Sequence, residues 1–321
     1  MAHVVPGPAG PPPLGPEGFD WTSWQTDPAV VGGLIVLGAA YAAATLWRHR
    51  LAPGARVEPL RAASFGGALV VLFVALTGPI HDLSDYYLFS AHMVQHMLLV
   101  FAMPPLLLHG TPGWMLRPLL RDPRLLRLGH LLTRPAGAFA TFNVILVAWH
   151  LPPVYNLAMD QHPAHVLGHL AMMAGSVILW WPVLSPVGEL PRAPYPVQLL
   201  YLFVVGLPMV MVAIFISMAD DLLYPYYAGA PRVWAPLTPR ADQHLGGLIM
   251  WVPGGMVFLI ALSVVFFRWQ VAGGHDVAGR GEAEGDAGRG EAEGEPSKYK
   301  RGAGRGAAAG EPSEYKEGGS A

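Results

Sequence analysis

Apolar residues fall along the chain in seven blocks, each long enough to cross a lipid bilayer as a helix. About 20 residues of α-helix cover the roughly 30 Å of hydrocarbon in a bilayer. The blocks occupy about 30–47, 62–79, 88–108, 135–150, 164–184, 197–217 and 244–267. This pattern predicts an all-α integral membrane protein, folded as a seven-transmembrane helix bundle.

Composition supports the membrane assignment and divides the chain into three parts. Of 321 residues, 53% are hydrophobic and 13% are charged, whereas about 25% are charged in an ordinary soluble domain. Segment 1–29 is rich in Pro and Gly and lacks the basic start of a signal peptide, so we expect a disordered lead. Segment 268–321 repeats "AGRGEAEGD" as "AGRGEAEGE", with too few apolar residues to build a core, so we expect a disordered tail. The transmembrane domain is then 30–267.

Basic residues predict the orientation. All but two of the 20 Lys and Arg lie in the loops after spans one, three and five or in the tail, and the two exceptions are Arg232 and Arg240. The side with the excess of basic residues faces the cytoplasm. We therefore expect the N-terminus outside and the C-terminus in the cytoplasm.

Histidines gather in the outer halves of the predicted spans. Span three carries His92 and His96, and span five carries His165 and His169. Each pair is four residues apart and so projects from one face of its helix. Both spans run inward, which puts the pairs at matched depths of about 6 and 12 Å, at 1.5 Å per residue. Span four ends in the same zone at His150.

This convergence predicts a metal site. Ionisable groups inside a membrane are functional candidates, and neutral imidazole is the commonest metal ligand. We predict that the ligands are His92, His96, His150, His165 and His169. Span seven begins in the same zone with Asp242, Gln243 and His244, and further candidate ligands are His244, Asp242, Met93 and Met97. The alternative for the two pairs is a structural hydrogen-bond network, and His81, His109 and His162 are expected in such structural roles.

The residue types narrow the choice of metal. The chain has no cysteine, which excludes thiolate and iron–sulfur sites. Imidazole suits zinc, copper, iron and nickel, and a thioether ligand favours Cu(I). Met93 and Met97 directly follow His92 and His96. Copper, as Cu(I), is therefore the predicted ion, although the residues also allow zinc.

Four stretches resemble one known family. "YLFSAHMVQHMLLVFAMPPLLLHGTP", "AWHLPPVYN", "HVLGHLAMMAGSVILWWPVL" and "DQHLGGLIMWVPGG" occur in this order over about residues 30–267. They are similar to the CtaG family, the multi-spanning cytochrome c oxidase assembly proteins of Gram-positive bacteria. The resemblance implies a multi-pass protein of the bacterial plasma membrane that helps to mature a haem-copper oxidase by supplying or inserting copper. It implies oxidase subunits and the lipid bilayer as partners, and it assigns function to the five predicted histidines and to Asp242 and Gln243.

Other roles stay open at this stage. The chain has no Walker loop, no G-x-S-x-G and no H-E-x-x-H, so we expect neither an enzyme nor a nucleic-acid partner. A haem-binding electron carrier is the first rival, with axial histidines drawn from facing helices because two histidines on one helix cannot hold both faces of a haem. A copper or proton permease and a metal-free scaffold for oxidase subunits are the others.

Overall fold

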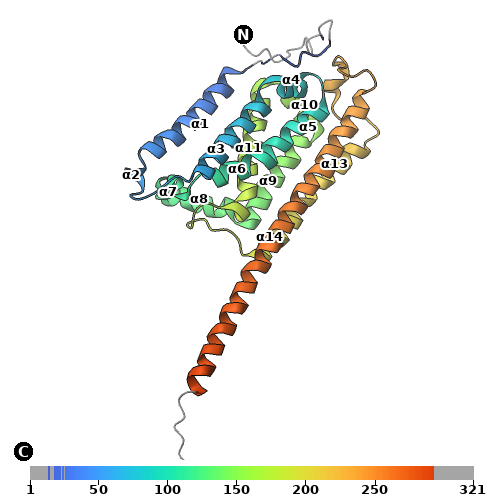
Figure 1. The fold of residues 1–321 in the computed structure, drawn as a ribbon. Coiled ribbons are helices and arrows are strands. Elements are labelled where there is room, and N and C mark those ends of the chain that lie inside the picture. The colour runs from blue at the N-terminus through green and yellow to red at the C-terminus, as the bar shows by residue number, and fades with distance from the viewer. Residues whose placement is uncertain (1–13, 15–17, 23, 25, 293–321) are drawn as a thin grey trace, which may run out of the picture. The chain divides into compact units, whose positions relative to one another are not determined.

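The computed structural model describes residues 14, 18–22, 24 and 26–292, with side chains described to residue 272. Helices dominate this part of the chain, and no β-strand occurs in it (Figure 1). Six of its helices are long and apolar enough to cross a membrane, and a bent pair makes up to seven candidate spans. The all-α prediction is therefore confirmed, with six to seven candidate spans where the sequence pattern predicts seven.

The candidate spans follow one another with short helices between them. The elements, in order, are α1 Pro28–Leu46, α2 Arg48–Leu51, α3 Pro59–Leu76, α4 Gly78–Tyr86, α5 Phe89–Met97, η1 Leu98–Ala102, α6 Met103–Gly110, α7 Gly113–Leu120, α8 Pro123–Thr133, α9 Pro135–His150, α10 Pro152–Asp160, α11 His162–Leu184, α12 Tyr195–Val205, α13 Leu207–Met218, η2 Pro225–Gly229 and α14 Pro239–Ala292.

The fourth span differs from the expected straight helix over 135–150. Helices α8 and α9 are together long and apolar enough to form one span, but they are bent by 77°. Arg134 is extended, with ψ 147°, and Pro135 begins the next helix, because a residue before proline disfavours the α conformation. By itself α9 has 16 residues and covers only about 24 Å at 1.5 Å per residue.

The third span, Phe89–Gly110, contains a π-helical turn over Leu98–Ala102. The amide of Met103 reaches back five residues to the carbonyl of Leu98, and Pro104 has no amide to give. The π-helical bond of Met103 leaves the Leu99 carbonyl without its α-helical donor, and Pro104 leaves the Val100 carbonyl without one. Side chains of α11 replace them: Ser176 Oγ donates to the Leu99 carbonyl at 3.2 Å, and Trp180 Nε1 donates to the Val100 carbonyl at 2.9 Å.

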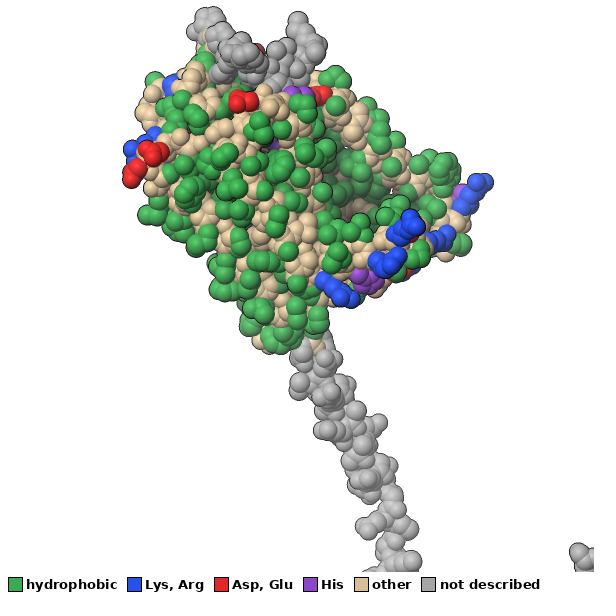
Figure 2. Space-filling model, turned by 180° about the vertical axis from the view of Figure 1, so that it is seen from behind, with side chains coloured by type: hydrophobic (Ala, Val, Ile, Leu, Met, Phe, Trp, Pro, Cys, Tyr) green, Lys and Arg blue, Asp and Glu red, His purple; other side chains and the backbone are tan. Residues whose placement is uncertain are grey.

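The main core lies among α5, α9, α11, α12, α13 and α14, while α1 has no buried residue and packs beside α3 (Figure 1). Hydrophobic side chains are spread over the face shown in Figure 2, as expected of a surface that meets lipid. Two compact units divide the chain after Trp269. In the second unit α14 stays helical to Ala292, and residues 293–321 lie outside the described residues. The disordered lead and tail and the domain limits therefore remain predictions.

Candidate metal centre

The two histidine pairs face each other across the bundle. On α5, the rings of His92 and His96 have centroids 4.4 Å apart, and on α11 those of His165 and His169 are 4.5 Å apart. Across the helices, the His169 ring lies 5.8 Å from both His92 and His96. The spacing of four residues on each helix thus brings the four imidazoles to the same level of the bundle, as the sequence predicts.

Three of these side chains form an inner triad: His92, His96 and His169. One ring nitrogen from each lies within 4.8 Å of the others, and all three residues are buried. Imidazole nitrogens about 2.0–2.1 Å from one tetrahedral ion lie about 3.3 Å apart. Rotamer adjustments of about 1 Å would therefore close the triad on an ion, a movement within the reach of buried side chains.

His150 flanks the triad from the end of α9. Its Nδ1 lies 2.7 Å from the carbonyl of Leu146, so this nitrogen carries the hydrogen and donates it. Donation from Nδ1 leaves the lone pair on Nε2, the form in which a histidine binds a metal. The His150 ring lies 5.8 Å from His96, so His150 stands beside the triad rather than within it.

Buried ring nitrogens around the triad lack partners. In the described part of the chain, no hydrogen-bond partner reaches Nδ1 of His92 and His96 or Nε2 of His150 and His169, and Nε2 of His165 has only the ion-pair contact with Asp85 at 3.5 Å. Buried polar atoms are almost always paired. A metal-free hydrogen-bond network would have satisfied these nitrogens, whereas an ion would take up their lone pairs, so the residues fit a metal.

A cavity connects four of the five predicted histidines. Its lining residues are His92, His96, Trp149, Tyr155, Ala158, Met159, His165 and His169. Met159 therefore places a thioether in the wall of the cavity. Neither Met93 nor Met97 lines it: Met93 lies in the apolar core, and the sulfur of Met97 lies 3.5 Å from the position that a Cβ on Gly254 of α14 would take. A helix position next to a ligand is turned about 100° away from it.

The candidates of span seven have other partners. Asp242 accepts hydrogen bonds from the amides of Phe89 and Ser90, at 2.7 and 3.1 Å, and from Ser90 Oγ at 2.5 Å. It thus caps the start of α5 from α14, where exposed amides and the helix dipole favour a carboxylate. His244 Nε2 lies 3.0 Å from the carbonyl of Ala219. Neither side chain belongs to the triad.

Gln243 also has a structural role. Its Oε1 accepts from the Leu223 amide at 2.7 Å, and its Nε2 donates to the Asp221 carbonyl at 3.1 Å. These bonds attach the loop after α13 to the start of α14. Gln243 therefore stabilises the position of that loop.

Sequence reasoning missed Asp85. This carboxylate lies between His81 and His165, 3.5 Å from Nε2 of each. Burial alone would raise the pKa of Asp85, but the two imidazoles outweigh it and hold the pKa well below its usual value. For its neighbour Asp82, burial and the charge of Asp85 raise the pKa to about 6. The signal in the sequence was the i, i+4 pairing of His81 with Asp85 just ahead of span three.

Close packing brings α11 to α9 beside the site. A Cβ on Gly168, next to His169, would overlap the indole of Trp149. Small residues at such contacts let membrane helices approach closely. Gly168 therefore helps to set the distance between the helices that carry His150 and His169.

The fold and the site define an all-α membrane protein with a buried imidazole cluster near one end of its spans. The family described as "Cytochrome c oxidase caa3 assembly factor" matches residues 39–271. The chain belongs to this family of assembly factors, as the sequence resemblance predicts.

Three mycobacterial relatives carry no assigned function. The chain is 25% identical to the uncharacterized protein ML1998 of Mycobacterium leprae over 83% of this chain and 42% of that protein. It is also 25% identical to the uncharacterized proteins Mb0105 of Mycobacterium bovis and MT0111 of Mycobacterium tuberculosis, over 77% of this chain and 39% of each relative. The chain thus spans about two fifths of their length. No solved structure matches it.

Proposed function

We propose that this assembly factor binds copper, as Cu(I), at its buried histidine cluster and supports the insertion of that copper into a haem-copper oxidase. The observation that carries the proposal is a group of buried imidazole nitrogens without hydrogen-bond partners. They are Nδ1 of His92, Nδ1 of His96 and Nε2 of His169, whose residues line one cavity, and Nε2 of the neighbouring His150. His92, His96 and His169 are the ligands, and His150 and His165 lie beside them. The metal ion is the cargo that the protein carries and takes part in no reaction on it.

The choice of copper rests on the donor set. The cluster offers imidazoles and, in the cavity wall, the thioether of Met159, without a carboxylate in the triad. Imidazole suits several transition metals, and a soft thioether shifts the preference toward Cu(I). The membership in an oxidase assembly family supports an oxidase subunit as the acceptor.

We further propose the topology that the basic residues predict, in the plasma membrane of a bacterium. All but two Lys and Arg then face the cytoplasm, with the N-terminus outside and the histidine cluster in the outer half of the bilayer. An acceptor subunit in the same membrane reaches the cluster from that side.

A cellular experiment tests the proposal. A strain that lacks the gene is complemented with the parent, with the double variant His96→Ala/His169→Ala or with His244→Ala as a matched control. We expect the parent and the control to restore copper and activity in the isolated oxidase and the double variant to restore neither. Full restoration by a well-expressed double variant would contradict metal delivery and favour a metal-free scaffold.

A further inference from the structure

A second set of metal-binding side chains adjoins the inner triad on its α4 side. Oδ2 of Asp85 lies 3.5 Å from His81 Nε2, and Oδ1 lies 3.5 Å from His165 Nε2. We name His81, Asp85 and His165 the outer site. Its members come from α4 and α11, so it bridges the segment before span three and the start of span five.

The separations in the outer site are long for hydrogen bonds. A charge-assisted N–H···O bond measures about 2.7–2.9 Å, so at 3.5 Å Asp85 and His165 form an ion pair rather than a short hydrogen bond. A nitrogen and an oxygen that bind one tetrahedral ion lie about 3.3 Å apart. The two contacts of Asp85 thus have the spacing of ligand pairs around a cation.

Asp85 is held in place from a distant loop. Tyr226 Oη donates to the Asp85 carbonyl at 3.0 Å, and Tyr227 Oη donates to the Ser84 carbonyl at 2.8 Å. The hydroxyl of Tyr227 also lies 2.9 Å from that of Tyr155, which lines the cavity. The backbone at Asp85 is therefore fixed relative to the cavity, as a transfer site needs.

His165 belongs to both sites. Besides its contact with Asp85, its ring lies 5.8 Å from His92 and 4.5 Å from His169, and it lines the cavity of the triad. An ion bound through His165 needs only to change its remaining ligands to move from one site to the other.

We propose that the outer site is the station through which a monovalent copper ion passes on its way between the exterior and the inner triad. The proposal rests on the copper-binding function above and adds a route to it. A carboxylate is a harder ligand than imidazole and holds Cu(I) less tightly. The inner triad therefore binds Cu(I) more tightly than the outer site does, and Cu(I) exchanges rapidly at the outer site.

The rate of loading separates this role from a purely structural one. Stopped-flow mixing of detergent-purified full-length protein with Cu(I), held by a competing chromophoric chelator, gives both the loading rate and the final stoichiometry. The variants are Asp85→Asn and His81→Gln, and the control is Asp82→Asn. Asp82 is a buried carboxylate on the same helix but does not belong to the outer site.

We expect Asp85→Asn and His81→Gln to load about 10-fold more slowly, the scale on which metal-site partners act, with the final stoichiometry unchanged and Asp82→Asn loading at the parent rate. If Asp85→Asn fails to fold, His81→Gln gives the same test. Loading at the parent rate in both variants would overturn the route alone. An equilibrium loss of copper at an unchanged rate would make Asp85 a positioning residue and would also overturn the route. A parent protein that binds no copper would overturn the proposed function itself.

Discussion

The indole of Trp180 donates a hydrogen bond to the backbone carbonyl of Val100, 2.9 Å away, and thereby replaces the amide that Pro104 lacks. The two residues lie on different spans, α11 and the π-helical turn of span three. In a membrane an unpaired carbonyl finds no water to bind. The bond therefore fastens α11 to span three one helical turn below His96.

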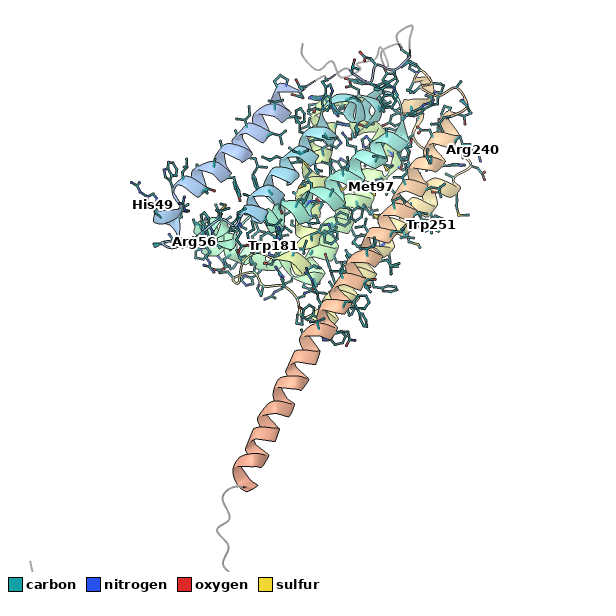
Figure 3. All side chains as sticks on the ribbon, viewed as in Figure 1. His49, Arg56, Met97, Trp181, Arg240 and Trp251 are labelled. Carbon is teal, nitrogen blue, oxygen red and sulfur yellow. The ribbon has the colours of Figure 1, made fainter. Side chains whose placement is uncertain are left out.

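Removal of this donor should destabilise the bundle. Trp180→Phe keeps most of the ring but leaves the Val100 carbonyl unpaired and buried, which costs about 1–3 kcal/mol. Thermal unfolding in detergent measures the loss. Trp251→Phe is the control, because Trp251 is 38% exposed on α14 (Figure 3).

A second substitution tests whether the Val100 carbonyl needs the Trp180 indole because Pro104 has no amide. Pro104→Ala supplies an amide four residues after Val100, so the carbonyl no longer needs the indole. In a double-mutant cycle, Trp180→Phe should cost less in the Pro104→Ala background than in the parent. Equal costs in both backgrounds would show that the indole acts through packing alone.

Asp242 should matter for stability rather than as a ligand. Asp242→Asn removes the charge that caps the first turn of α5 and weakens three hydrogen bonds, at a cost of about 2 kcal/mol. The loss appears as a lower unfolding temperature, with copper stoichiometry retained in the folded fraction. Asp220→Asn is the control, since the side chain of Asp220 is 96% exposed. A stable Asp242→Asn protein that binds no copper would instead make Asp242 a ligand.

Gly168 should be needed for the approach of α11 to α9. In Gly168→Ala the new methyl group overlaps the Trp149 indole, and overpacking of this kind costs about 1–3 kcal/mol. We expect lower stability and weaker copper binding, because His169 moves with its helix. Trp149→Phe in the same chain should restore part of both. Gly32→Ala is the control, since nothing lies within 4 Å of the position of its Cβ, and equal losses in the two alanine variants would contradict the packing argument.

The sequence predicted the architecture and the paired histidines for clear physical reasons. Apolar block length revealed the spans, and the i, i+4 spacing on two helices placed His92 and His96 opposite His169. Such patterns are local in the sequence, and the regular geometry of a helix fixes which of their residues lie on the same face. The family resemblance came from the same local stretches.

Contacts between distant segments were beyond this reasoning. The capping of α5 by Asp242 joins residues about 150 positions apart, and nothing in the spacing distinguishes such a cap from a ligand. The contact of Asp85 with His165 joins α4 to α11 and depends on how α4 folds back. These features arise from packing rather than from periodicity.

The most direct test of the account is the copper content of the purified protein. Mass spectrometry is applied to the detergent-solubilised chain after loading with Cu(I) under reductant. The same measurement is made on His92→Ala/His96→Ala and on the control His244→Ala, because the His244 ring bonds the Ala219 carbonyl and lies outside the triad. We expect about one copper per chain in the parent and the control and much less in the double variant, because the loss of two ligands lowers the affinity by about 10-fold or more. Equal copper in all three proteins, or none in a folded parent, would contradict this expectation.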